Sequence, residues 1–417
     1  MAKVIKKKKF LCRDELEQMD KPALIDKVLQ LEAHNQQLKQ ILEKKMSTDK
    51  GDTANSSRKF DFTKCHKRHI LLKFYYLGWD FQGFASQEDS LNTIEYHLFN
   101  ALMKSCLIEN RESSNYHRCG RTDKGVSAFS QVISLDIRSS LKPEDQYNIS
   151  NELLYCKILN RLLPKTIRCI SWCPVSSETS ARFDCKWRKY KYYFPRGNLN
   201  IEAMDEAAKL LIGSHDFRNF CKMDVANGVI NFQRTILDAA VACTVKNNQN
   251  ITTGYDMCEL TIRSNAFLWH QIRCIMGILF LVGRHQEEIK IVSDLLDIEK
   301  CPRKPQYNLA LHIPLNLFCC EYDSTDWFHD VLELEKVVKD LQEEWCYASV
   351  KATMTKDMLD NLRSLFSDEM GFPEYQSNCL LQGVEPKVYK PLVERETCES
   401  LEDRIEHYTK KQRIKLD

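Results

Sequence analysis

Cysteine pairs at the Cys-x-x-Cys spacing are missing from the sequence, although it contains 18 cysteines in 417 residues. Local zinc sites usually have that spacing, and the sequence therefore predicts no metal site. Walker loops and the Rossmann glycine fingerprint are missing too, so we expect no cofactor. Because a chain of this length is no short secreted scaffold, its cysteines are expected to be reduced thiols, and we expect the protein in the nucleus and cytoplasm.

Long apolar runs are also missing. The longest, from Ile272 to Val282, contains Arg273 and is too short to cross a bilayer. The basic start Lys6–Lys9 is not followed by the apolar core of a signal peptide. We therefore expect neither a membrane span nor a signal peptide. The lysine run is compatible with a nuclear-import signal, an RNA-binding arm or a solvated tail.

The net charge is only +2, but the basic residues are unevenly distributed. From Arg182 to Arg196, six Lys or Arg stand against one Asp, with aromatic residues between them. Such a mixture suits contacts with a nucleic-acid backbone and stacking on bases. The same alternation is typical of a strand with one core face and one solvated basic face. The candidate contacts in this segment are Arg182, Lys186, Lys189 and Lys191.

A loop of mixed charge, residues 117–129, is the most informative part of the sequence. One acidic residue, Asp123, lies among the cations Arg118, Arg121 and Lys124. Two glycines in the loop allow the backbone to turn tightly. A carboxylate among cations stays ionised, because opposite charge favours its charged form. An ionised Asp on a cation-lined loop suits chemistry on a polyanion, and the alternative is a surface loop with a local ion pair.

The N-terminal part of the chain is predicted as a basic tail (residues 1–15), a helix (16–46) and a polar linker (47–68). Within the helix, Leu24, Leu31 and Leu38 recur every seven residues, which is one of the two core positions of a heptad. Asn35 occupies the other core position once. This pattern is typical of a two-stranded coiled coil. An amphipathic helix packed on the body of its own chain would have the same pattern.

The rest of the sequence alternates between strand-like and helix-like segments. Two such halves, residues 69–175 and 176–325, predict an α+β protein with helices packed on an antiparallel sheet. Residues 326–417 form an acidic extension, with twenty Asp or Glu against thirteen Lys or Arg, for which the sequence suggests no role. Strands are predicted at 69–76, 133–137, 166–172, 187–194, 234–244 and 257–263. Helices are predicted from residue 94, after the cap Asn92-Thr93, and at 151–163, 202–212 with Gly213 as C-cap, 269–282 and 288–298.

Four segments resemble, in the same order, the motifs of TruA-type tRNA pseudouridine synthases, and the likeness extends over residues 69–322. The run Cys221–Val229 resembles the eukaryotic branch called tRNA pseudouridine synthase 3, which modifies uridines at tRNA positions 38 and 39 in the anticodon stem-loop. Bacterial members have His where this sequence has Ser127, so no role of that His can be transferred. The four segments are Tyr75–Phe84, Arg121–Ala128, Ser180–Phe183 with Arg188–Tyr192, and Asn265–Arg273.

The resemblance implies two related α/β lobes, residues 69–175 and 176–325, which share a mostly antiparallel sheet and have a basic cleft between them. It implies tRNA as the partner and a homodimer, which the heptads of the N-terminal helix allow. The reaction breaks the bond between C1′ and N1, turns the uracil and joins C1′ to C5. This isomerisation needs no redox change and no energy input, so the implied enzyme has no cofactor.

By resemblance, Asp123 is the catalytic carboxylate, which either adds to C1′ or takes the 2′ proton. Tyr190 matches the tyrosine that stacks on the uracil and can remove the C5 proton, although packing within a strand is its ordinary role. Arg273 matches the arginine that pairs with the catalytic Asp. An arginine in an apolar helix is costly to bury unpaired, so a carboxylate is expected near it.

The remaining predicted contacts come from the loop itself. Arg121 matches the residue that fills the space left by the flipped base, and Arg118 and Lys124 are predicted phosphate contacts. Cys119 is interpreted as a packed thiol.

Three other functions stay open at this point. An inactive relative that binds and chaperones tRNA is expected to have lost Asp123, Tyr190 or Arg273, all of which are present. A coiled-coil scaffold would bind a partner without depending on RNA. A member of the sister branch would modify other tRNA uridines.

Overall fold

The computed structural model describes residues 60–87, 90–244, 254–323, 325–366, 378–383 and 388–411. The chain divides into two units, Met1–Asp61 and Phe62–Asp417, and the following description concerns the second. The predicted basic tail, the predicted N-terminal helix with its heptads, and most of the predicted linker lie outside the described residues.

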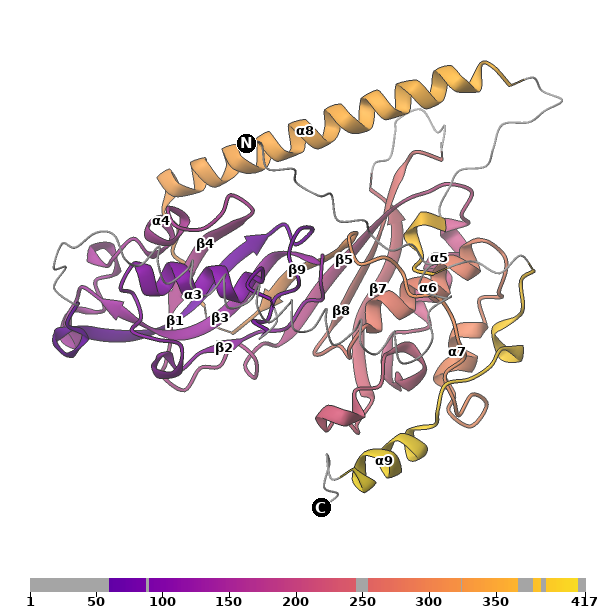
Figure 1. The fold of residues 1–417 in the computed structure, drawn as a ribbon, viewed down its shortest axis with the longest axis horizontal. Helices are drawn as coiled ribbons and strands as arrows, with labels where there is room; N and C mark the ends of the chain where they lie inside the picture. The colour runs from indigo at the N-terminus through magenta and orange to yellow at the C-terminus, as the bar shows by residue number, and fades with distance from the viewer. Residues whose placement is uncertain are drawn as a thin grey trace, which may run out of the picture. The chain divides into compact units, whose positions relative to one another are not determined.

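The described strands form one nine-stranded sheet (Figure 1), in the order β4-β1-β3-β9-β5-β8-β7-β6, with β2 paired to β3 beside this path. All neighbours in it are antiparallel except β3 and β9. The prediction of a mostly antiparallel sheet with helices is therefore confirmed. The strands are β1 (His66–Tyr76), β2 (His117–Arg118), β3 (Ser127–Ser139), β4 (Ile167–Pro174), β5 (Trp187–Pro195), β6 (Gly213–Asp216), β7 (Gln233–Cys243), β8 (Met257–Ser264) and β9 (Leu315–Glu321).

Strand β9 joins the two halves of the sheet. It runs parallel to the start of β3, where Leu317 lies opposite Ala128, and antiparallel to β5, where Leu317 lies opposite Tyr190. Because neighbouring strands are about 4.8 Å apart, Tyr190 lies roughly 10 Å from the end of the Asp123 loop. The sheet therefore brings together two sequence motifs that are far apart in the chain.

The helices begin and end at residues that their local hydrogen bonds explain. Helix α3 begins after Thr93, whose side chain accepts a hydrogen bond from the backbone N–H of Tyr96. Helix α5 packs on β7 and on α6, and α4 packs on β4. The helices are α3 (Ile94–Lys104), α4 (Tyr155–Asn160), α5 (Ile201–Lys209), α6 (Gln271–Gly283), α7 (Ile291–Leu296), α8 (Val331–Arg363) and α9 (Leu401–Lys410).

Every strand and helix predicted within residues 69–298 has a counterpart, but two of the helices are much shorter than predicted. The segment predicted as a helix at 151–163 is helical only in α4, because Glu152 is extended and its carboxylate pairs with Arg68 and accepts from the N–H of Ser140. The segment predicted at 288–298 ends at α7, since the Asp297 carboxylate accepts the N–H groups of the residues after it.

The prediction that Gly213 caps a helix is wrong. Helix α5 ends four residues earlier, with Leu210 as its C-cap. Gly213 has a φ of +116° and begins β6, an edge strand that the sequence analysis did not predict. A glycine suits this position because L side chains rarely adopt that φ.

The acidic extension packs on the sheet through its long helix, α8. Asp330 caps this helix by accepting the N–H of Glu333. The Asp340 carboxylate accepts from Arg168 on β4 at 3.0 Å, and the Glu333 carboxylate accepts from Asn160 on α4 at 3.2 Å. None of the helices in the described part of the chain combines the length and the apolarity that a membrane crossing needs.

Candidate active site

Two of the family-like motifs form one structural unit around the Asp123 loop. The N–H of Phe84 donates to the carbonyl of Thr122 at 3.1 Å, and the N–H of Gly125 donates to the carbonyl of Phe81 at 3.2 Å. The Ser127 hydroxyl accepts from the N–H of Gly78 at 2.9 Å. These bonds fix the backbone on both sides of Asp123. They also give Ser127 a structural contact at the position where bacterial members have His.

Glycine is required at two positions of this unit. Gly125 has a φ of +75°, and a Cβ there would lie 2.3 Å from the His312 ring. A Cβ on Gly78 would lie 1.9 Å from the carbonyl oxygen of Val126. Both contacts are far shorter than van der Waals distance, so the loop can close in this way only without side chains at these positions.

The Asp123 carboxylate meets three groups that come from the start of α6. Arg273, the partner predicted for it, has its Nη1 atom 3.5 Å from Oδ2. The Nε2 atom of His270 lies 3.3 Å from Oδ2, and the indole N–H of Trp269 donates to Oδ1 at 3.3 Å. The Asp123 side chain is still 30% exposed. The carboxylate is therefore oriented by donors and accessible to a substrate at the same time.

Arg273 is held in place independently of Asp123. Its side chain is buried, and its Nε–H donates to the carbonyl of Ala310 at 2.9 Å. A buried guanidinium is stable only with partners for its charge and its N–H groups. Arg273 therefore presents a fixed positive charge to the Asp123 carboxylate.

Trp269 and His270 are site residues for which the sequence analysis predicted no role. His270 precedes α6 with a φ of +61°, a conformation that is uncommon outside glycine and recurs at functional sites. Burial lowers the pKa of His270 to about 4, although the Asp123 charge acts in the opposite direction. The imidazole is therefore neutral at neutral pH, and Arg273 is the charged partner of Asp123. Both residues belong to the motif that ends at Arg273, which was the available signal.

The branch-like run of residues 221–229 contacts the same site. The Lys222 ammonium lies 4.3 Å from the ring centre of Trp269, and the backbone N–H of Lys222 donates to the carbonyl of Trp269 at 3.0 Å. The Asp224 charge acts on Arg121 from the same run. A segment that distinguishes the branch is therefore attached to the group that orients Asp123.

Tyr190 lies in the sheet beside the site. Its ring is buried and meets the ring of Phe267 edge-on, with 5.2 Å between the ring centres. Burial raises the pKa of the Tyr190 hydroxyl well above its usual value. No contact joins Tyr190 directly to Asp123 within the part of the chain that the structure describes. Phe267 belongs to the segment that continues to Trp269, so the tyrosine borders the site through this aromatic neighbour.

Arg118, a predicted phosphate contact, already has a partner within the protein. Its Nη1 atom lies 2.5 Å from the buried carboxylate of Glu95. Glu95 also accepts from Arg111, from the Tyr116 hydroxyl and from the N–H of Ser86. Arg118 is thus part of a dense polar cluster under the loop.

The other predicted RNA contacts fall into two groups. Arg121, Lys124 and Arg182 are exposed, and none of them forms a salt bridge with another described residue. Burial lowers the pKa of Arg121, and the charges of Arg118 and Arg182 lower it further, which indicates that these cations gather near one another.

The basic residues in and just before β5 have partners on or next to the sheet. Lys186 lies 2.6 Å from Asp323, and Lys191 lies 2.9 Å from Glu259. The Lys189 ammonium lies near the rings of Trp187 and Phe318. Tyr190 and Tyr192 face the core, as the expected alternation of a strand with a core face requires.

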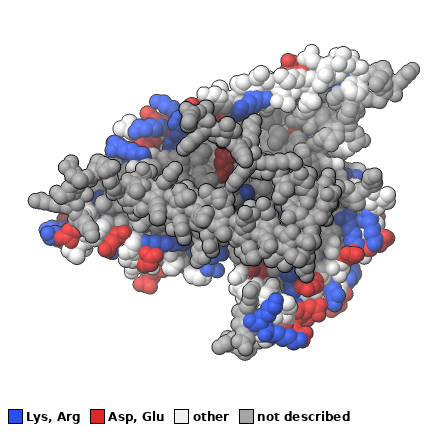
Figure 2. Space-filling model, viewed as in Figure 1, with Lys and Arg blue, Asp and Glu red and all other residues white. Residues whose placement is uncertain are grey.

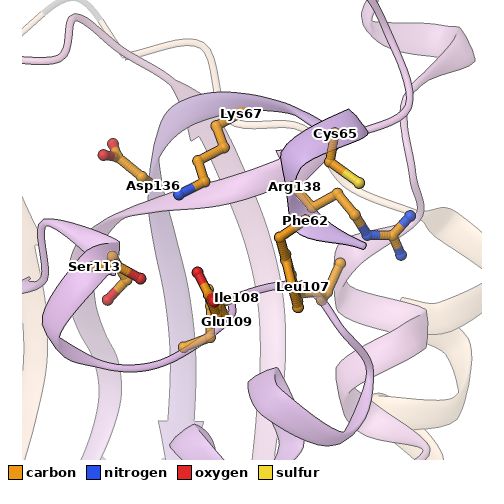
Figure 3. Close-up of a pocket in the computed structure, with 10 residues that line it drawn as sticks. Phe62, Cys65, Lys67, Leu107, Ile108, Glu109, Ser113, Asp136 and Arg138 are labelled. Carbon is orange, nitrogen blue, oxygen red and sulfur yellow. The ribbon is translucent and has the colours of Figure 1, made fainter. Parts of the chain in front are cut away.

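The described side chains on the face shown in Figure 2 do not single out another site. Among the described side chains visible in Figure 2, basic and acidic residues are interspersed. The pocket in Figure 3 lies between the end of β3 and the turn after α3, and it is lined by residues such as Lys67, Leu107, Glu109 and Asp136. None of the predicted site residues lines this pocket. The chemistry of the chain is therefore best sought at Asp123.

Comparisons with known proteins show which family this chain resembles. The family model for tRNA pseudouridine synthase matches residues 207–323, which include α6 with Arg273 but not the Asp123 loop. A protein of Bos taurus named "tRNA pseudouridine(38/39) synthase" is 43% identical over 97% of this chain and 91% of its own length. The protein of that name from Homo sapiens is 43% identical over 94% of this chain and 88% of its own length.

A third relative matches a smaller share of this chain. The "tRNA pseudouridine(38/39) synthase" of Saccharomyces cerevisiae is 43% identical over 68% of this chain and 64% of its own length. Together with the loop motifs and the position of Arg273 beside Asp123, these similarities identify the family. The chain belongs to the TruA-type tRNA pseudouridine synthases.

Proposed function

We propose that this synthase converts uridines 38 and 39 of the tRNA anticodon stem-loop to pseudouridine. The observation that carries the proposal is the half-exposed Asp123 carboxylate held beside Arg273 and His270. The choice of positions is supported by the relatives of Bos taurus and Homo sapiens, whose names specify 38/39 and which cover most of this chain at 43% identity. The contact of Lys222 with Trp269 links the branch-like run to the site.

The target uridine leaves the helix stack before it reacts, at a cost of a few kcal/mol. Asp123 then acts on the ribose, the C1′–N1 bond breaks, and the turned uracil is joined to C1′ through C5 while the C5 proton leaves. Arg273 keeps Asp123 ionised, because a nearby positive charge favours the carboxylate. The indole N–H of Trp269 and the Nε2 atom of His270 each lie 3.3 Å from one of the two carboxylate oxygens and so limit how the carboxylate can turn.

The RNA contacts in this proposal follow the exposed cations. Arg121 fills the space of the flipped base, and Lys124 and Arg182 bind phosphates near the loop. Their exposure and the absence of salt bridges to other described residues support these roles. Tyr190 stacks on the uracil from the sheet side, and Lys186, Lys189 and Lys191 extend the contact along β5.

The tRNA lies in a basic cleft between two related lobes, residues 69–175 and 176–325. Support comes from β9, which joins strands of both halves beside the Asp123 loop. Binding over both halves would explain why the catalytic Asp and its arginine come from different halves.

We also propose that the protein works in the nucleus and cytoplasm. If the run Lys6–Lys9 is an import signal, replacing these lysines by Ala in a fluorescent fusion should reduce the nuclear signal.

A homodimer is part of this proposal. The heptads of residues 24–42 support it. Helix α8 gives a second reason, because one face of it exposes apolar residues at intervals of three and four. These residues are Tyr347, Val350, Met354, Met358 and Leu362.

Light scattering at micromolar concentration tests the homodimer. We expect a dimer for the full-length protein and weaker association for Met354→Glu with Met358→Glu. Val393→Glu, another exposed apolar position, is the matched control. A monomer for the unaltered protein would refute the proposal.

The experiment that tests the function is base-resolution mapping of pseudouridine in tRNA. Cells lacking the protein should lose pseudouridine at positions 38 and 39, and expression of the unaltered protein should restore it. Asp123→Asn at equal abundance should not. Unchanged modification at 38 and 39, or a loss confined to other tRNA positions, would show that the proposed target is wrong.

A further inference from the structure

Three buried cysteines converge directly behind the Asp123 loop. The Sγ atoms of Cys119, Cys185 and Cys320 all lie within 4.8 Å of one another. The residues come from the loop that leads to Asp123, from the segment before β5 and from β9. Cys119 and Cys320 are 201 positions apart in the sequence, which is why no local spacing predicted the cluster.

The geometry differs from that of ordinary thiol packing. The Cys119 thiol donates to the Cys320 sulfur at 3.4 Å, and the Cys185 thiol, which donates to the carbonyl of Trp187 at 3.3 Å, lies within 4.8 Å of both. A disulfide would use two of these sulfurs and leave the third. A soft metal ion uses all three, because thiolates at about 2.3 Å from one ion lie about 3.8 Å from one another.

The charge of Arg188 acts on all three cysteines. The Nη2 atom of Arg188 donates to the Cys119 carbonyl at 3.0 Å. A fixed cation therefore lies against the three sulfurs.

We propose that Cys119, Cys185 and Cys320 together bind one thiophilic metal ion, with Zn²⁺ as the test ion. Binding of Zn²⁺ to the three thiols releases three protons and leaves a complex with one negative charge, which Arg188 offsets. The Tyr322 hydroxyl donates to the Ala181 carbonyl at 2.6 Å and also contacts Cys119. A hydroxyl oxygen that could serve as a metal ligand therefore lies beside the three sulfurs.

Such an ion would stabilise the position of the Asp123 loop without contacting the substrate. Cys119 lies four residues before Asp123, and its N–H donates to the carbonyl of Val132 on β3 at 2.9 Å. Linking its sulfur to Cys320 would fix the loop to β9, the strand that joins both halves of the sheet. The cysteines are therefore positioning residues, and the ion takes no part in the isomerisation.

Metal content gives the first test. The full-length protein, purified without chelator and then equilibrated with Zn²⁺ and desalted, should retain about one ion per chain by elemental mass spectrometry. Cys119→Ser, Cys185→Ser and Cys320→Ser should each retain markedly less. Cys156→Ser, a buried thiol outside the cluster, is the matched control and should retain as much as the unaltered protein.

A spectroscopic test does not depend on whether the variants fold. Substituting Co²⁺ in the unaltered protein should give the thiolate-to-cobalt charge-transfer absorption of a sulfur-rich site, and removing the metal should lower its thermal unfolding midpoint by several degrees. Folded protein that binds neither Zn²⁺ nor Co²⁺ would overturn the proposal. A disulfide between any two of the three cysteines, found by non-reducing peptide mapping of freshly isolated protein, would overturn it as well.

Discussion

The carboxylates of Glu95 and Asp123 both lie beside arginine side chains, but they differ in burial and in the distances to their donors. Glu95 has a side chain that is 1% exposed, and it accepts hydrogen bonds from Arg118 at 2.5 Å and from Tyr116 at 2.7 Å. Asp123 has a side chain that is 30% exposed, and its nearest donors lie at 3.3 to 3.5 Å. Both are paired acids, but only one has room for another molecule.

The difference separates a structural acid from a reactive one. The oxygens of Glu95 are saturated, and its hydrogen bonds lower its pKa although burial acts in the opposite direction. Such a group stabilises the fold and has no free lone pair for a substrate. The longer contacts of Asp123 orient its carboxylate and leave one side accessible. This contrast is the basis of the following predictions.

The largest effect is expected at the reactive acid. Asp123→Ala should abolish pseudouridine formation, a loss of at least about 10³-fold, because the chemistry at the ribose requires a carboxylate. Binding of tRNA should survive, since removing an anion reduces repulsion of phosphates. Tritium release from C5-labelled uridine in tRNA and a filter-binding isotherm measure the two effects. Asp145→Ala, at an exposed acid outside the site, is the control and should behave like the unaltered protein.

The charge partner of the reactive acid comes next. Arg273→Ala should reduce turnover by about 10²- to 10³-fold, because Asp123 loses the charge that keeps it ionised. The variant should also be less stable, since Ala310 loses a buried hydrogen bond. Arg273→Lys keeps the positive charge and should recover part of the activity in the tritium assay. Full activity of Arg273→Ala would mean that the pair with Asp123 has no catalytic role.

The structural acid should show the reverse behaviour. Glu95→Gln should lower the free energy of unfolding by about 3 kcal/mol, because it leaves buried arginine and tyrosine donors without their charged acceptor. The pKa of Glu95 is lowered in the folded state, so its contribution is present above its ordinary pKa of about 4.3 and is lost as pH falls through the folded value. Urea unfolding at neutral pH and at pH values below about 4 tests both statements, and a variant as stable as the parent would contradict them.

A smaller effect is expected on the salt dependence of tRNA binding. It should differ between the cations that form salt bridges within the described residues and those that form none. Replacing Arg121, Lys124 and Arg182 by Ala should reduce the salt dependence of tRNA affinity by roughly two, in units of log Kd per log salt. Replacing Lys186, Lys189 and Lys191 should also flatten the slope but by less, because Lys186 and Lys191 must exchange Asp323 and Glu259 for phosphates. Binding measured over a series of salt concentrations decides this, and the opposite order would place the RNA mainly along β5.

The smallest effect is expected for Tyr190→Phe. Burial raises the pKa of the Tyr190 hydroxyl well above its usual value, so the phenolate is a minor species at neutral pH and a weak candidate for proton removal. The phenyl ring can still stack on the uracil. Turnover should therefore fall only a few-fold, whereas Tyr190→Ala should lose much more. A loss in Tyr190→Phe as large as that of Asp123→Ala would assign the C5 proton to this hydroxyl.

The sequence predicted the contacts of the reactive acid, Asp123, better than those of the structural acid, Glu95. Asp123 lies in a motif, and the family resemblance implied its pairing with Arg273. General energetics added that an arginine inside an apolar helix requires a carboxylate nearby. Nothing local indicated that Arg118 would meet Glu95, because that pair depends on how β2 and α3 come together. The same holds for the cysteine cluster, whose members are far apart in the chain.

The strands and helices also differ in how well the sequence predicted them. A continuous apolar run predicted β1, which is buried on both faces, and alternation predicted strands such as β5, whose two faces have distinct environments. The sequence analysis did not predict β9, which ends the matched region, or α8, whose apolar residues are largely exposed. Helix boundaries depended on single polar groups. The Glu152 carboxylate, for example, is bound by Arg68 on β1, and this pair shortens α4 in a way that no local pattern indicates.

Comparing Asp123→Asn with Glu95→Gln tests the central claim most directly. Both substitutions remove one charge and keep nearly the same shape. For each variant we would measure the thermal unfolding midpoint and the pseudouridine turnover per folded molecule on the same preparation. We predict that Asp123→Asn keeps the midpoint of the parent and has no detectable turnover, and that Glu95→Gln unfolds at a lower temperature while each folded molecule stays active. Turnover by folded Asp123→Asn, or loss of turnover in fully folded Glu95→Gln, would contradict the assignment of Asp123 as the reactive acid.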